Sequence, residues 1–161
     1  MAKKATTKVP EGMYTVTPQL CFNGNCREAI EFYKKAFNAE LIGNIAESPD
    51  GKSVWHAMIK IGNSHIMMGD AMPGGYETGP KGTSTVGIWL YVEDCDAWFD
   101  RAVKAGAEPA MPPMDAFWGD RMGKLKDPFG HSWDIASHDW DYTPEEIQQK
   151  QEEFLASMNG A

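Results

Sequence analysis

The sequence has few cysteines, and nothing in their spacing pairs them. Cys21, Cys26 and Cys95 are its three cysteines, and no two of them have CxxC spacing. Even sets of cysteines staple small secreted domains, and CxxC pairs are typical of zinc and redox sites. Neither pattern is present, so we expect three reduced, structural thiols in a cytoplasmic protein.

Basic residues and long apolar runs are also scarce. The 15 Lys and Arg are outnumbered by 23 Asp and Glu, which gives a net charge of −8, and they form no basic stripe. Nucleic acids and anionic membranes attract basic surfaces, so we expect neither as a partner. No apolar run approaches the roughly 20 residues of a transmembrane helix, and none follows Lys3 and Lys4 as in a signal peptide.

Familiar cofactor and catalytic motifs are missing. The sequence contains no GxGxxG, Walker loop, nucleophile elbow or HExxH motif. A glycine-rich loop between a strand and a helix is what a nucleotide-like cofactor would need. We therefore expect no such cofactor.

The composition is that of an ordinary globular protein. With 161 residues, 42% hydrophobic and 24% charged, the chain is long enough to bury a hydrophobic core that needs no disulfide or metal ion to stabilise it. Residues 1–12 are polar, and we expect a mobile tail there. Thr143-Pro144-Glu145-Glu146 is a capping box with proline at the first helical position, which predicts a C-terminal helix over 143–160. The folded domain then covers residues 13–142.

Each half of this domain shows the same order of elements. The first half predicts a strand over 14–22, a helix over 26–37, a short strand over 40–46, and strands over 54–61 and 64–69. A linker rich in Gly and Pro follows over 71–81. The second half predicts a strand over 84–92, a helix over 94–105, a short extended segment over 108–111, and a hairpin with arms at 122–126 and 132–136.

An offset of 68 residues aligns the two halves. With it, Gly62-Asn63-Ser64 falls on Gly130-His131-Ser132. Self-similarity at a fixed period indicates a duplicated module, because one such module cannot cover its own sheet. We infer two βαβββ modules, at residues 13–72 and 82–138.

Asp134 is a lone acid in the apolar returning arm of the hairpin. A bare buried carboxylate is costly. The side chain must therefore be hydrogen-bonded, paired with a cation, bound to a metal, or directed into a wet cavity.

Several segments resemble the vicinal oxygen chelate superfamily, which includes glyoxalase I, extradiol dioxygenases and the fosfomycin- and bleomycin-resistance proteins. The tandem βαβββ order is the first similarity, and the local sequences are closer still to the PhnB-like group. These segments are residues 18–26, 29–33, 65–73, 117–119 and 127–131.

The resemblance implies an α+β fold. Its tandem βαβββ modules would form a curved, incomplete β-barrel around a solvent-reachable cavity, followed by the C-terminal helix, and the protein would be a homodimer. In metal-dependent members, the first and last strands of each module supply His and Glu ligands. The offset of 68 places these positions at Gln19, Ile66, Gly87 and Asp134, or at Met67 instead of Ile66 if that strand slips by one residue.

Most of the residues at these positions are poor ligands for a divalent metal. A catalytic divalent ion normally has about three protein ligands. Only Asp134 is an anionic oxygen ligand, so we expect no metal and no other cofactor. If a metal were bound, Asp134 would hold it together with Gln19 or His56.

We expect instead a cavity that binds a small organic ligand. Trp and Tyr suit a ligand wall, although they equally suit the packing between two sheets. Arg121, with Trp118, could clamp an anionic or planar ligand, or could pair with Asp120 or Asp127 at the surface. The candidate ligand-binding residues are Gln19, His56, Met58, Trp89, Tyr91, Trp118, Arg121 and Asp134.

Three functions fit these observations. The first is metal-free binding of a small molecule, by a sequestering or resistance-type protein or by an enzyme of unspecified reaction. The second is a metal-dependent lyase or dioxygenase-like enzyme that recruits His56, His65 or His131 as ligands. The third is a structural or interaction protein whose cavity is packed shut.

Overall fold

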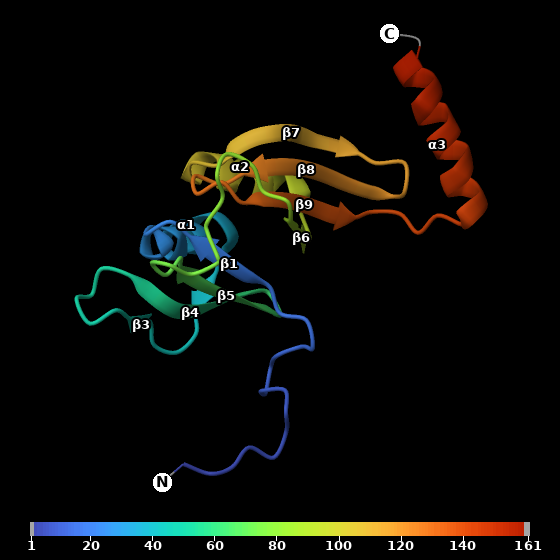
Figure 1. The fold of residues 1–161 in the computed structure, drawn as a ribbon. Helices are drawn as coiled ribbons and strands as arrows, with labels where there is room; N and C mark the ends of the chain where they lie inside the picture. Colours follow the sequence, from blue (N-terminus) through green and yellow to red (C-terminus); the bar gives the residue numbers. More distant parts are fainter. Residues whose placement is uncertain (1, 160–161) are drawn as a thin grey trace. The chain divides into compact units, whose positions relative to one another are not determined.

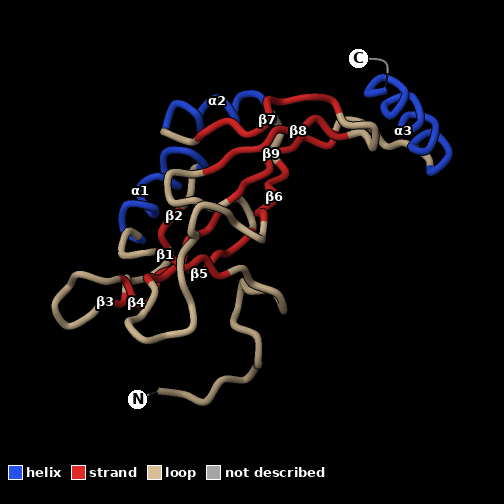
Figure 2. Tube along the Cα trace, turned by 45° about the horizontal axis from the view of Figure 1, so that its top comes forward, coloured by secondary structure: helices blue, strands red, loops and turns tan. Residues whose placement is uncertain are grey.

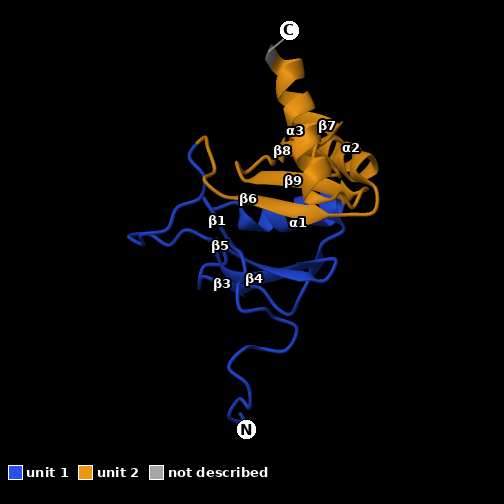
Figure 3. Cartoon of the chain, turned by 90° about the vertical axis from the view of Figure 1, so that its right-hand side faces the viewer, with its two compact units in different colours: residues 1–81 blue, residues 82–161 orange. Residues whose placement is uncertain are grey.

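The computed structural model describes residues 2–159, so Gly160, where the predicted C-terminal helix ends, lies outside the described part. The chain forms two compact units, residues 1–81 and 82–161 (Figure 3). Each unit has its own sheet. The boundary falls at the end of the segment that we predicted as a linker.

The first unit contains a mixed sheet and one helix (Figure 1). The sheet order is β1-β5-β4-β2, and β3 also pairs with β4. β1 is parallel to β5, and the other pairs are antiparallel. The elements are β1 (Gln19–Phe22), α1 (Cys26–Phe37), β2 (Glu40–Leu41), β3 (Ala46–Glu47), β4 (Val54–Ile61) and β5 (Ser64–Asp70).

A buried aspartate joins α1 to this sheet. Asn25, at the N-cap of α1, makes no side-chain capping bond. Asp70 of β5 replaces it, because its carboxylate accepts hydrogen bonds from the backbone N–H of Cys26 at 3.0 Å and of Val54 at 2.8 Å. The first N–H groups of a helix lack partners within the helix, so this contact fixes where α1 begins.

The second unit repeats the arrangement (Figure 2). Its sheet order is β6-β9-β8-β7, with β6 parallel to β9. α2 contacts β7, β8 and β9, whereas α3 extends beyond the ends of these strands (Figures 1 and 2). The elements are β6 (Gly87–Tyr91), α2 (Cys95–Ala105), β7 (Glu108–Asp115), β8 (Asp120–Lys126), β9 (Ser132–His138) and α3 (Pro144–Asn159).

The α+β class and the tandem strand–helix–strand order are confirmed, with three corrections to the strands. The single strand predicted over 40–46 is instead two separate short strands, β2 and β3. The first strand begins at Gln19 rather than at residue 14, and Val16 is 84% exposed. β7 continues to Asp115 instead of ending at Met111, although three prolines interrupt it. It is an edge strand with two register shifts, and prolines that cannot donate a hydrogen bond are tolerated there.

The constant offset of 68 residues between the modules is wrong. Asp70 of β5 and Ser137 of β9 play the same part. Each accepts a hydrogen bond from the first backbone N–H of the helix in its own unit, that of Cys26 and that of Cys95 respectively. These two acceptors are 67 residues apart. The turns differ in length, with two residues between β4 and β5 and five between β8 and β9, so one offset cannot align every strand.

The pairing of the parallel strands corrects the equivalent positions. Gln19 pairs with Met67, and Trp89 pairs with Asp134. The counterpart of Asp134 is therefore Met67, and the counterpart of Gln19 is Trp89 rather than Gly87.

None of the helices in the described part of the chain has both the length and the apolar character that a membrane span requires.

Candidate functional site

Asp134 lies on the face of the second sheet opposite α2. Its neighbours on β9, Trp133 and Ile135, are fully buried in the core, and successive side chains of a strand point to opposite faces. Asp134 is only 5% exposed. Its Oδ1 contacts the ammonium of Lys124, which lies directly opposite on β8. The sequence left Asp134 four alternatives: a hydrogen bond, a cationic partner, a metal or a wet cavity. The structure shows the cationic partner.

Trp89 completes a row of three side chains across the sheet. It is the partner of Asp134 on β6, and the Lys124 Nζ lies 5.9 Å from the centre of its indole ring. Gly87 makes room for this arrangement, since a Cβ at that position would lie 2.9 Å from Asp134 Oδ2. We call Trp89, Asp134 and Lys124 the Asp134 row.

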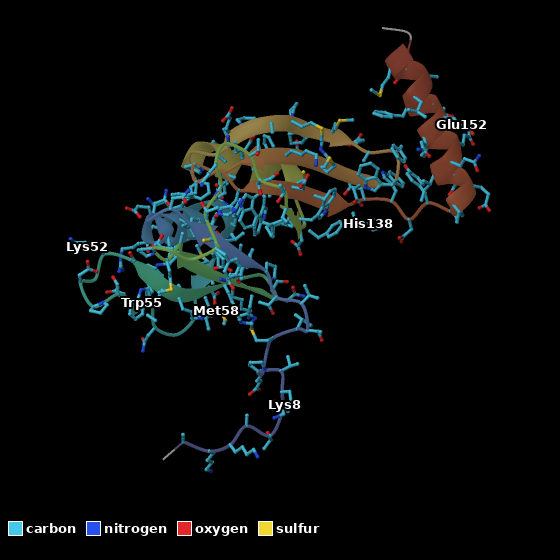
Figure 4. The ribbon with its side chains drawn as sticks, viewed as in Figure 1. Lys8, Lys52, Trp55, Met58, His138 and Glu152 are labelled. Carbon is cyan, nitrogen blue, oxygen red and sulfur yellow. The ribbon has the colours of Figure 1, made fainter. Side chains whose placement is uncertain are left out.

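A second polar group, the Asp120 network, lies where β8 begins and β9 ends. Asp120 is 3% exposed, and its Oδ2 accepts hydrogen bonds from the Tyr91 hydroxyl and the Trp118 indole N–H, each at 2.9 Å. His138 Nδ1 lies 2.7 Å from its Oδ1, and His138 Nε2 lies 3.0 Å from Asp141 Oδ1. Figure 4 shows His138 where the chain leaves β9 toward α3.

The Asp120 network moves the pKa values of its members. Burial acts to raise the pKa of Asp120, but the hydrogen bonds from His138, Trp118 and Tyr91 outweigh it, and the pKa is lowered. The hydrogen bonds to Asp141 and Asp120 raise the pKa of His138. The hydrogen bond to Asp120 raises the pKa of the Tyr91 hydroxyl. The network therefore favours an ionised Asp120 next to a protonated His138.

The first unit has a corresponding row without an acid. Gln19, Met67 and Met58 are neighbours across β1, β5 and β4. Gln19 is exposed, and the two methionines are half-buried. His56 points to the same face as Met58, two residues earlier on β4 (Met58 is labelled in Figure 4). This row offers an amide and two thioethers.

Arg121 lies apart from the other candidate residues. It follows Asp120 on β8 and so points to the opposite face, where Asp96 of α2 binds its Nε and Nη2 and Asp115 of β7 binds its Nη1 at 2.9 Å. These hydrogen bonds raise the pKa of its guanidinium. The ion pair predicted as the alternative role of Arg121 exists, but its partners are Asp96 and Asp115, not Asp120 or Asp127.

Three important residues were missing from the predicted site: Lys124, Asp120 and His138. The hairpin itself could have indicated Lys124. The five-residue turn places Lys126 opposite Ser132. Two residues further from the turn on each strand, Lys124 lies opposite Asp134. The same pairing places Asp120 opposite His138 at the open end of the hairpin.

The residues at the family's metal-ligand positions do not fit a divalent metal. Gln19, Met67, Trp89 and Asp134 supply an amide, a thioether, an indole and one carboxylate, and the Lys124 ammonium already contacts that carboxylate. Within residues 2–159, no three His, Cys, Asp or Glu side chains gather closely enough to hold a metal ion.

No disulfide joins the three cysteines, and two of them are poor nucleophiles. Cys26 and Cys95 are the first residues of α1 and α2, and both are buried. Burial raises the pKa of the Cys26 thiol to about 12 and that of the Cys95 thiol to about 11. The nucleophile is the thiolate, so these two side chains are structural at neutral pH.

Comparison with known proteins agrees with this fold. The family model of the Glyoxalase/Bleomycin resistance protein/Dioxygenase superfamily matches residues 18–135. The uncharacterised protein Mb0911c of Mycobacterium bovis is 41% identical over 125 residues, which cover 74% of this chain and 81% of that protein. The crystal structure of PA1353 from Pseudomonas aeruginosa has a TM-score of 0.62 at 27% identity, covering 79% of this chain and 99% of the other.

A PhnB protein from Bacillus cereus shares the fold, with a TM-score of 0.62 at 21% identity over 77% of this chain and 99% of that one. The resemblance inferred from the local sequence segments is thus confirmed. This chain belongs to the Glyoxalase/Bleomycin resistance protein/Dioxygenase superfamily.

Proposed function

We propose that this protein binds a small organic ligand without a metal, and that the Asp134 row is its principal contact. The observation that carries the proposal is the ion pair between Lys124 and Asp134 next to the half-exposed ring of Trp89. A planar ligand would stack on this ring, while the ammonium would donate to a polar group of the ligand and the carboxylate would accept from it.

The energetics of the ion pair support a role in binding. Replacing a buried ion pair by apolar residues of similar volume is often neutral or stabilising, so such a pair is weak support for a purely structural role. Tyr91 lies on the same face as Trp89, and the Asp120 network holds its hydroxyl. It would extend the aromatic wall, with Trp118 behind it.

In the first unit, Gln19, His56 and Met58 remain candidate ligand contacts, because they share one face of its sheet. Arg121 is excluded from the proposal, since two carboxylates occupy its guanidinium on the other face. The proposal also includes a homodimer, from the resemblance, and a cytoplasmic location, from the reduced thiols.

The experiment is a thermal-shift screen of small planar acids and amides, followed by calorimetric titration of the ligands found. Trp89→Ala and Lys124→Met should each weaken binding by about tenfold or more. Trp55→Ala and Lys52→Met are matched controls with exposed side chains, and should bind as the parent protein does. A ligand whose affinity is unchanged by both row variants would overturn the assignment of the site.

The metal-dependent enzyme is the competing function. His56 and His65 lie on neighbouring strands β4 and β5, but His65 pairs with Lys60 and His56 pairs with Ala46. Elemental analysis of the purified protein separates the two functions. Stoichiometric Zn, Ni, Fe or Mn that is lost in Asp134→Ala would contradict the metal-free proposal.

A further inference from the structure

The second unit contains a cavity that lies away from the Asp134 row. Its volume is about 400 Å³, within the usual range for small-molecule sites. It lies between the turn that joins β7 to β8, the segment over 139–142, and α3. We call it the α3 pocket. None of Trp89, Lys124 and Asp134 lines it.

Gly119 holds one side of the α3 pocket in place. Its carbonyl accepts hydrogen bonds from the backbone N–H of Asp139 at 3.1 Å and of Trp140 at 3.0 Å. Its φ is 108°, and a Cβ there would lie 2.2 Å from the Trp140 carbonyl oxygen. Only glycine allows the turn and the segment after β9 to meet so closely. This side of the pocket is therefore formed before any ligand arrives.

Aromatic rings form much of the wall. Trp140 and Tyr142 are stacked, with ring centroids 6.3 Å apart. Phe117, in the turn, contacts Phe154 of α3 at 5.9 Å between ring centroids. Trp140 is 63% exposed and Phe154 is 36% exposed, so ring surface is left for a ligand.

The charge of the lining is negative. It includes four carboxylates, of Asp115, Asp120, Asp139 and Glu153, against the two cations Arg121 and Lys150. Arg121 is paired with Asp115 and Asp96, and Asp120 is paired with His138, so the remaining lining carboxylates are those of Asp139 and Glu153. Lys150 Nζ lies 4.6 Å above the centre of the Tyr142 ring. The Tyr142 ring thus already makes a cation–π contact with the Lys150 ammonium, and the other aromatic rings of the pocket can make the same contact with the ammonium group of a ligand.

We propose that the α3 pocket binds a small organic cation, such as an amine or a quaternary ammonium compound. The cation would lie on the exposed ring of Trp140, because Lys150 already covers the Tyr142 ring, and Asp139 and Glu153 would be its counter-charges. An anion of the same size would be repelled by the carboxylates, and a neutral ligand would gain nothing from them.

The test compares choline with its neutral isostere 3,3-dimethylbutan-1-ol, by NMR titration of the full chain. The two molecules have the same shape and differ in charge. Choline should bind, and the isostere should bind about tenfold more weakly. Equal binding of both molecules, or no binding of choline at millimolar concentration, would overturn the proposal.

Matched variants locate the site. Glu153→Gln should weaken choline binding by about threefold or more, whereas Glu152→Gln, the neighbouring residue of α3 that does not line the pocket, should leave it unchanged. Trp140→Ala should weaken it, and Trp55→Ala in the first unit should not. Equal effects within either pair would contradict the assignment. Trp89→Ala should not affect choline, which separates this proposal from the Asp134 row.

Discussion

Lys124 and Asp134 lie directly opposite each other on β8 and β9, and the lysine ammonium contacts the aspartate carboxylate on the face away from α2. The aspartate is nearly inaccessible, while the lysine side chain is 46% exposed. One partner is thus fixed by the sheet, and the other remains accessible to a ligand.

Removing the cation should leave a buried carboxylate without its partner. We expect Lys124→Met to lower the free energy of unfolding by about 1–3 kcal/mol, because an unsatisfied buried charge keeps its desolvation penalty. Urea unfolding followed by circular dichroism measures the change. The double variant Lys124→Met/Asp134→Leu should recover most of the loss. A double variant as unstable as the single one would show that the unpaired carboxylate is not the cause.

A side chain at residue 87 should displace the Asp134 carboxylate. We expect Gly87→Ala to cost about 1–2 kcal/mol, since its Cβ would lie 2.9 Å from Asp134 Oδ2. The cost should be smaller when Asp134 is also alanine, because the clashing oxygen is then absent. Unfolding of the two single variants and the double variant tests this. Strictly additive effects would contradict it.

His138 should make stability depend on pH. Its pKa is raised by Asp141 and Asp120, so its contribution is fully present below the unfolded value near 6.5 and is lost as the pH rises through the folded value. Asp120 acts in the opposite direction. Its pKa is lowered, so its contribution is lost as the pH falls through its folded value.

The measurement is the free energy of unfolding at several pH values between about 6 and 9. The advantage of the parent protein over His138→Gln should shrink as the pH rises across this range. NMR titration of the imidazole gives the pKa of His138 directly. A value at or below 6.5 would show that the two carboxylates do not act on the ring as described.

Arg121 should matter modestly for stability and not at all for the Asp134 row. It joins α2 to β7 through partly exposed ion pairs, which contribute at most about 1 kcal/mol and weaken with salt. We expect Arg121→Met to lower the free energy of unfolding by that amount and to leave binding of the small organic ligand at the Asp134 row unchanged. Loss of ligand binding in a folded Arg121→Met protein would instead support the anion clamp considered from the sequence.

Much of the fold could be predicted from the sequence because its periodicities are local. α1 and the Asp127-Pro128-Phe129-Gly130 turn both follow from residue spacing. The extent of β7 could not be predicted, since its prolines argue against a strand unless its place at the sheet edge is known.

The site was partly predictable. Asp134 was identified because an acid in an apolar strand needs a partner, but its partner required the register across the hairpin. Arg121 was misplaced for a related reason. Trp118, Asp120 and Arg121 are close in sequence, yet the alternation of β8 directs Asp120 and Arg121 to opposite faces. The sequence alone did not show that Gln19 and Trp89 occupy equivalent positions. That equivalence follows from the pairing of β1 with β5 and of β6 with β9, which no single offset between the modules reproduces.

The central claim is that a small molecule binds at the Asp134 row without a metal. The most direct test is calorimetric titration of a ligand from the thermal-shift screen into protein dialysed against a chelator, with Lys124→Met measured in parallel. We predict that the parent protein keeps its affinity after dialysis and that Lys124→Met loses about tenfold or more. Binding that disappears on dialysis and returns with an added divalent metal would contradict the claim.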